Sequence, residues 1–70
     1  MRFYKCRFLK EGEMFGPAYT YKSEKEYRVG DKVLVAGGKK VVVTGFETDF
    51  SRIKFYGVDK VKLILEKVED

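Results

Sequence analysis

The sequence contains no histidine and no tryptophan, and only one cysteine and one proline in 70 residues. Without histidine, the Ser-His-Asp and Cys-His catalytic arrangements and histidine-based metal sites are excluded. The lone Cys6 excludes an intramolecular disulfide and the zinc sites that need several thiolates. The carboxylates of Asp49 and Asp59 are interpreted as solvated turn residues. We therefore expect a protein that is not an enzyme and that uses no cofactor.

Long hydrophobic runs are also missing. The first nine residues, M-R-F-Y-K-C-R-F-L, carry a basic side chain at every second or third position. We accordingly expect neither a signal peptide nor a membrane span there. The sequence predicts a cytoplasmic protein with no membrane partner, in which Cys6 is a small core residue.

Large rings and clustered cations are what the chain does have. Its length predicts a single domain over residues 1–70, and aromatic residues make up 16% of it, as six Phe and five Tyr. The net charge is only +4, but the positive charges are grouped. No acid occurs among the first ten residues, and a second basic group is opposed only by Asp59; the two groups are Arg2, Lys5, Arg7, Lys10 and Arg52, Lys54, Lys60, Lys62.

Residues 27–46 predict the central hairpin. Two β-branched runs, V-L-V at 33–35 and V-V-V-T at 41–44, flank Gly37-Gly38, which can take the positive φ angles of a tight turn. Gly30-Asp31 predicts a turn before this hairpin. Gly45, isolated within a strand pattern, predicts a bulge or a barrel corner.

Strands are also predicted on both sides of the hairpin. Residues 3–9 alternate, which places Tyr4, Cys6 and Phe8 inward and Lys5 and Arg7 outward.

Residues 10–17 hold two glycines and the only proline, and predict a loop. Residues 18–22 predict a short strand with Tyr19 and Tyr21 on one face. Residues 52–56 predict a fifth strand, with Ile53 and Phe55 on one side.

The last segment, residues 59–69, fits two structures. Val61, Leu63 and Leu65 alternate as in a strand, whereas Val61, Ile64, Leu65 and Val68 match the spacing of a short helix. The strand is favoured because a small sheet needs its edges paired.

Five or six short strands with glycine corners predict a mainly all-β fold. The architecture expected is a small, partly open antiparallel β-barrel of the SH3-like type, with an OB-like barrel as the alternative.

Basic and aromatic residues interleave on these strands in the manner of small nucleic-acid-binding barrels, where cations follow the backbone and rings stack on bases. Phe3, Phe8, Phe46 and Phe55 are assigned to packing. The candidate nucleic-acid-binding residues are Lys5, Arg7, Tyr19, Tyr21, Lys39, Lys40, Arg52, Lys54 and Tyr56.

Two resemblances accompany this pattern. Tyr19-Thr20-Tyr21, the V-G-D-K-V-L-V run at 29–35 and the K-K-V-V-V run at 39–43 resemble the start of the N-terminal DNA-binding domain of the primosomal helicase PriA. The K-C-R-F-L opening at 5–9, with the same Tyr-Thr-Tyr and Val-Gly-Asp strands, is similar to small proteins encoded by phages and prophages. The PriA likeness implies a small barrel that binds DNA, and the phage-protein likeness implies the same barrel fold.

The leading hypothesis is therefore a nucleic-acid-binding β-barrel that serves as an accessory protein of a phage or mobile element, with DNA favoured and single-stranded DNA as one of the alternatives. The alternative is a protein-interaction module that engages a partner, or a second copy as a homodimer, through sheet edges and exposed aromatics.

Overall fold

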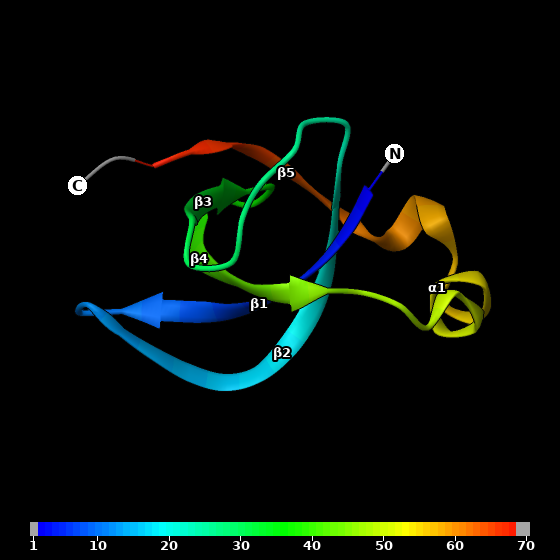
Figure 1. Ribbon diagram of the computed structural model, residues 1–70, viewed down its shortest axis with the longest axis horizontal. Helices are drawn as coiled ribbons and strands as arrows, with labels where there is room; N and C mark the ends of the chain where they lie inside the picture. Colours follow the sequence, from blue (N-terminus) through cyan, green and yellow to red (C-terminus); the bar gives the residue numbers. More distant parts are fainter. Residues whose placement is uncertain (1, 69–70) are drawn as a thin grey trace.

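The computed structural model describes residues 2–68, without the side chains of Arg52 and Tyr56. Five strands form a barrel in the order β1-β2-β5-β3-β4 (Figure 1). The elements are β1 (Arg2–Lys10), β2 (Glu13–Ser23), β3 (Lys32–Val35), β4 (Lys39–Phe46), α1 (Phe50–Tyr56), the 3-10 turn η1 (Val58–Lys60) and β5 (Lys62–Lys67).

The predicted all-β barrel is confirmed. The ring of strands is closed, and it is closed by a parallel pairing of β2 with β5. That pairing is short, since only Tyr21↔Lys62 and Lys22↔Leu63 are in register. All other neighbouring strands are antiparallel.

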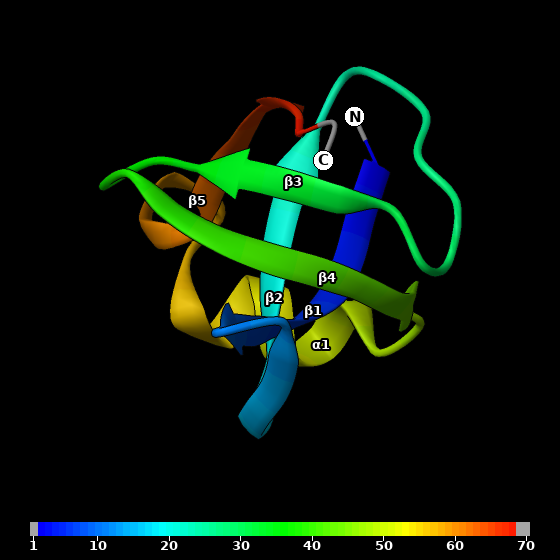
Figure 2. The same ribbon diagram turned by 90° about the vertical axis from the view of Figure 1, so that its left-hand side faces the viewer.

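The central hairpin is confirmed as β3 and β4. Gly37 and Gly38 occupy the turn with φ angles of 100° and 80°, which favour glycine, and the Gly38 N–H donates to the Val35 carbonyl at 3.0 Å. Seen in Figure 2, the two strands cross steeply in front of β1 and β2.

The bulge predicted at Gly45 is also present. In the β1–β4 ladder Lys5 pairs with Gly45 and Cys6 with Val43, so Thr44 is the extra residue. The last segment forms the favoured strand, β5, which also contains a bulge. Its buried residue within the strand is Ile64, whereas Leu63 and Leu65 are exposed.

The loop predicted over residues 10–17 is wrong. Only Glu11 and Gly12 form the turn, with φ angles of 53° and 82°, and β2 begins at Glu13. Gly16 and Pro17 lie within β2, where the register shifts from Cys6↔Tyr19 to Phe8↔Phe15. Residues 16–18 of β2 stand opposite Arg7 alone, so the signal interpreted as a loop marks a bulge inside a long strand.

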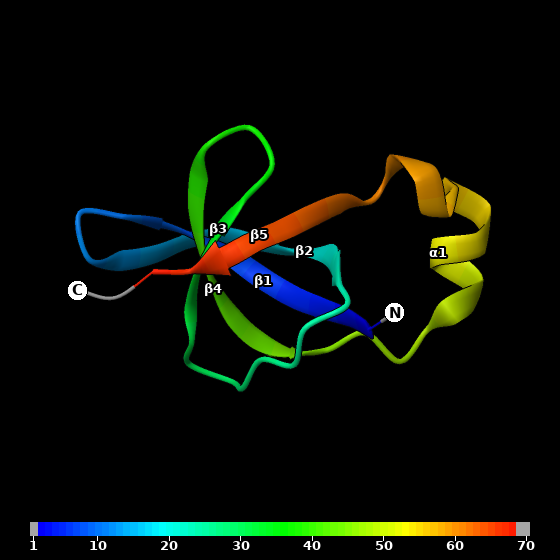
Figure 3. The same cartoon turned by 90° about the horizontal axis from the view of Figure 1, so that it is seen from above.

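The strand predicted over residues 52–56 is also wrong, because this segment is helix α1. Ile53 is buried, but Phe55 is 96% exposed, so the two do not share an inward face. Gly57, at φ 102°, ends the helix, and its N–H donates to the Ile53 carbonyl at 2.8 Å. The barrel takes its fifth strand from residues 62–67, which leaves α1 at one end (Figure 3).

The core is built on tyrosines and valines. Tyr4, Tyr21 and Tyr27 are buried together with Cys6, Val33, Val35, Val41, Val43 and Ile64, and Phe8 packs against them. Phe46 and Phe55, expected to pack inside, are more than half exposed. Because Tyr rings fill the interior, the molecule carries several Phe rings on its surface.

The β1–β2 hairpin forms an arm at the opposite end of the long axis from α1 (Figures 1 and 3). Arg7 Nε donates to the Gly16 carbonyl at 2.9 Å, which links the two strands of the arm across the bulge. Within residues 2–68, no helix is long and apolar enough to span a membrane.

Candidate nucleic-acid interface

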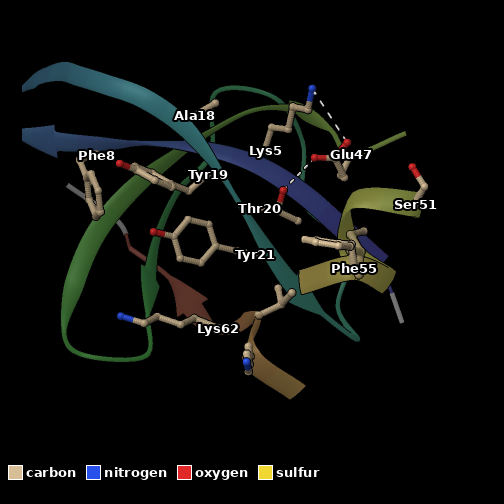
Figure 4. Close-up of a pocket in the computed structure, with 13 residues that line it drawn as sticks. Lys5, Phe8, Ala18, Tyr19, Thr20, Tyr21, Glu47, Ser51, Phe55 and Lys62 are labelled. Atoms are coloured by element: carbon tan, nitrogen blue, oxygen red, sulfur yellow. Dashed lines mark hydrogen bonds and ion pairs between the residues drawn. The ribbon is translucent and has the colours of Figure 1, made fainter. Parts of the chain in front are cut away.

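A groove of about 930 Å³ lies between strands β1 and β2 and the segment formed by α1 and η1 (Figure 4). Its aromatic lining is Phe8, Tyr19, Tyr21 and Phe55, and its lysines are Lys5, Lys60 and Lys62. In Figure 4, Phe8 and Tyr19 lie at one end, Phe55 at the other, and Tyr21 between them.

The groove lies beside the part of β2 that is not paired with β5. The parallel pairing with β5 includes Tyr21 and Lys22, and no residue of β2 before Tyr21 is in register with β5. Lys22 Nζ donates to the Val58 carbonyl at 2.7 Å, which holds η1 close to β2. The groove is therefore a consequence of how the barrel is closed.

Phe8 is the centre of a ring cluster at the end of the groove nearer the arm. Its ring centroid lies 5.5 Å from that of Tyr19 and 5.8 Å from that of Phe15, with which it is stacked. Lys39 Nζ lies over the Phe8 ring, 5.3 Å from the centroid, a cation–π distance.

A second hollow of about 330 Å³ shares Phe8 with the groove and is otherwise lined by Leu9, Lys10, Phe15, Lys39 and Lys40. Through their shared Phe8 the two hollows form one aromatic track, and lysines line both hollows.

Glu47 is a buried carboxylate in the groove wall. It accepts hydrogen bonds from Thr20 Oγ1 at 2.8 Å and from the Asp49 N–H at 2.9 Å, and Lys5 Nζ lies 4.0 Å away. These partners offset the cost of burying the charge. They also tie β1, β2 and the start of α1 to the end of β4.

Two groups in this region stay protonated at neutral pH. Burial, with smaller contributions from Cys6 and Tyr19, raises the pKa of Tyr21. Burial also raises the pKa of the Cys6 thiol to about 12. Tyr21 therefore offers the groove a neutral ring and hydroxyl, and Cys6 is a core residue, not a reactive thiol.

The predicted site residues are divided among several places. Lys5, Tyr19 and Tyr21 line the groove, and Lys39 and Lys40 line the second hollow. Arg7 is engaged with Gly16, as described above. Lys54 is exposed on α1 but lines neither hollow, and the side chains of Arg52 and Tyr56 lie outside the described part of the chain.

Ten residues of the groove lining were not predicted as part of a site: Phe8, Ala18, Thr20, Glu47, Ser51, Ile53, Phe55, Lys60, Val61 and Lys62. The two lysines belong to the second basic group of the sequence, which is the signal that points to them. Phe8 and Phe55 were assigned to packing, and no sequence signal distinguishes Glu47 from the other acids.

Among the described residues, no group of three His, Cys, Asp or Glu side chains is placed to hold a metal ion. Comparisons with family models, with curated proteins and with solved structures find no match to this chain.

Proposed function

We propose that this protein binds single-stranded nucleic acid, with DNA favoured, along the track from the groove to the second hollow. The observation that carries the proposal is a set of rings bordered by lysines, in which Phe15, Tyr19 and Phe55 are exposed and Phe8 is half-buried; the lysines are Lys5, Lys39, Lys40, Lys60 and Lys62.

Stacking is the first support. Tyr19 and Phe15 are about half exposed, and Phe55 is almost fully exposed, although each has a large apolar surface. A ring in such a position gains favourable contact when a base stacks on it, typically about 1–3 kcal/mol per base. Bases within a duplex are already stacked, so these rings favour a single strand.

Charge is the second support. Lysines line both hollows beside the rings, where a backbone passing over the rings would place its phosphates. The phage and PriA resemblances agree with this function and favour an accessory role in a phage or mobile element. The SH3-like and OB-like barrel classes expected from the sequence include such binders.

The test is a fluorescence-anisotropy titration of a labelled 12-nucleotide single strand and of the matching duplex, at low and moderate salt. We expect micromolar binding of the single strand that weakens as salt rises, and weaker binding of the duplex. Absence of binding at high micromolar protein, or binding indifferent to salt, would contradict the proposal.

A second candidate is a protein-interaction module, and one feature favours it. Met14 and Phe15 are exposed on the arm, and residues 13–20 of β2 have no β5 partner in the part of the chain described. Pro17 and the bulge act against pairing along this edge, since both are devices that protect free edges. Light scattering near millimolar concentration tests self-association, and a strict monomer would count against a homodimer.

A further inference from the structure

Two hydroxyl groups among the residues that line the groove already donate their hydrogens to carboxylates. Thr20 Oγ1 donates to Glu47 Oε2 at 2.8 Å, and Ser51 Oγ donates to Asp49 Oδ1 at 2.5 Å. A carboxylate can only accept, so the hydroxyl must be the donor in each pair. Figure 4 shows Thr20 turned toward Glu47.

The consequence for a ligand is chemical. A hydroxyl that has given its hydrogen away can still accept through its oxygen lone pairs. Thr20 and Ser51 therefore present acceptors to whatever occupies the groove. The ligand atom that suits them is an N–H donor.

The orientation of a bound strand follows from charge. Glu47 makes the wall near Thr20 unfavourable for phosphate, whereas Lys62 lies on the other side of the rings in Figure 4. A strand stacked on the exposed rings of Tyr19 and Phe55 is then expected to place its phosphates toward Lys60 and Lys62. Its base edges face Thr20 and Ser51.

We propose, on the basis of the proposed function, that the groove prefers bases that carry an exocyclic amino group. Cytosine presents a two-hydrogen donor at N4, where uracil has the acceptor O4. Opposite a hydroxyl that can only accept, the cytosine amino group gains a hydrogen bond, whereas the O4 oxygen of uracil faces the lone pairs of another oxygen. Lys5 is the competing donor on this wall, and its Nζ is drawn toward Glu47, 4.0 Å away.

The experiment compares oligo-dC and oligo-dU of 12 nucleotides by competition anisotropy at fixed salt. These strands share phosphates, sugars and ring size and have no 5-methyl group, so stacking and charge nearly cancel. We expect dC12 to bind about 3- to 10-fold more tightly than dU12, the range given by one net hydrogen bond.

Variants locate the preference. Thr20→Val removes the hydroxyl and should bring the ratio close to one, whereas Thr20→Ser should keep it. Thr44→Val is the matched control, since the Thr44 hydroxyl donates to the Lys5 carbonyl and does not line the groove. Ser51→Ala should lower the ratio of dC12 to dU12 affinity. Because Ser51 is exposed, this variant still tests the same wall of the groove if Thr20→Val fails to fold.

Two results overturn the inference. One is equal binding of dC12 and dU12, or tighter binding of dU12, by the wild-type protein, as expected if Lys5 reads O4. The other is a preference that survives both Thr20→Val and Ser51→Ala. Failure to bind either strand would instead overturn the proposed function itself, so the two failures are distinguishable.

Discussion

The hydroxyl of Tyr4 accepts a hydrogen bond from the backbone N–H of Tyr27 at 3.0 Å and donates one to the Lys25 carbonyl at 3.1 Å. The Tyr4 and Tyr27 rings pack edge to face, with centroids 5.8 Å apart. Tyr4 therefore both fills the core and holds the connection between β2 and β3 against β1.

Tyr4→Phe is expected to destabilise the fold by about 1–3 kcal/mol. The ring remains, but the buried Tyr27 N–H loses its acceptor, and an unmade buried hydrogen bond costs more than a made one contributes. Urea unfolding followed by circular dichroism measures the change in free energy of unfolding.

Tyr27→Phe is the matched control. The Tyr27 hydroxyl is buried and has no hydrogen-bond partner among the described residues. Removing it is expected to leave stability unchanged or to raise it by a few tenths of a kcal/mol. Equal destabilisation by the two variants would contradict the role assigned to the Tyr4 hydrogen bonds, because both variants keep their rings.

The hairpin of β3 and β4 and the inward face of β1 were predictable because each depends on local pattern. Two valine runs around Gly37-Gly38 leave few alternatives to a hairpin, and the alternation at residues 3–9 identifies Tyr4 and Cys6 as buried. Both signals are contained within fewer than fifteen residues.

The helix α1 and the groove beside it were not predictable in this way. Ile53 and Phe55 alternate as in a strand, and only the competition for the fifth barrel position decides that residues 62–67 occupy it. The same error affects the site, since Phe55 and Lys60 reach the groove from α1 and η1, and Lys62 reaches it from the start of β5, which pairs with β2. Lys5, Tyr19 and Tyr21 were identified because they lie on strands of correct pattern.

Gly16 is expected to tolerate substitution less well than Gly45. Gly16 has a φ of 74°, which costs an L-residue about 1–2 kcal/mol, whereas Gly45 is not at positive φ. An added Cβ meets nothing within 4 Å at either position, so backbone conformation alone separates them. Gly16→Ala should lower the free energy of unfolding by about 1 kcal/mol, and Gly45→Ala should change it by less than about half that.

Thermal or urea unfolding of the two alanine variants makes this comparison. If Gly45→Ala proved the more damaging, the bulge at Gly16 would not have the conformation described.

Cys6 is expected to make stability fall at alkaline pH. Its pKa of about 12 in the fold lies above the usual 9.0, so the folded state keeps a proton that the unfolded chain loses. This contribution is fully present below pH 9 and is lost as the pH rises from 9 toward 12. Between pH 8 and 10.5 the loss is at most about 2 kcal/mol.

The measurement is the free energy of unfolding at both pH values for the wild-type protein and for Cys6→Ala. All the tyrosines are present in both proteins, so the difference between their alkaline losses reports the thiol together with its smaller effect on the pKa of Tyr21. The variant should lose less stability; equal losses would mean that the thiol is not desolvated.

In binding, the rings and the lysines of the groove should have separable effects. Tyr19→Ala is expected to weaken the binding of a 12-nucleotide single strand by about 5- to 100-fold, since stacking is worth about 1–3 kcal/mol per base. The salt dependence of binding should stay unchanged.

Lys62→Gln removes one phosphate contact and should reduce the slope of log K against log salt by about 0.7. Lys67→Gln is the control, because Lys67 Nζ lies 3.5 Å from Asp31 and does not line the groove. Titrations at four salt concentrations give both quantities. A slope changed equally by Lys62→Gln and Lys67→Gln would place the strand elsewhere on the surface.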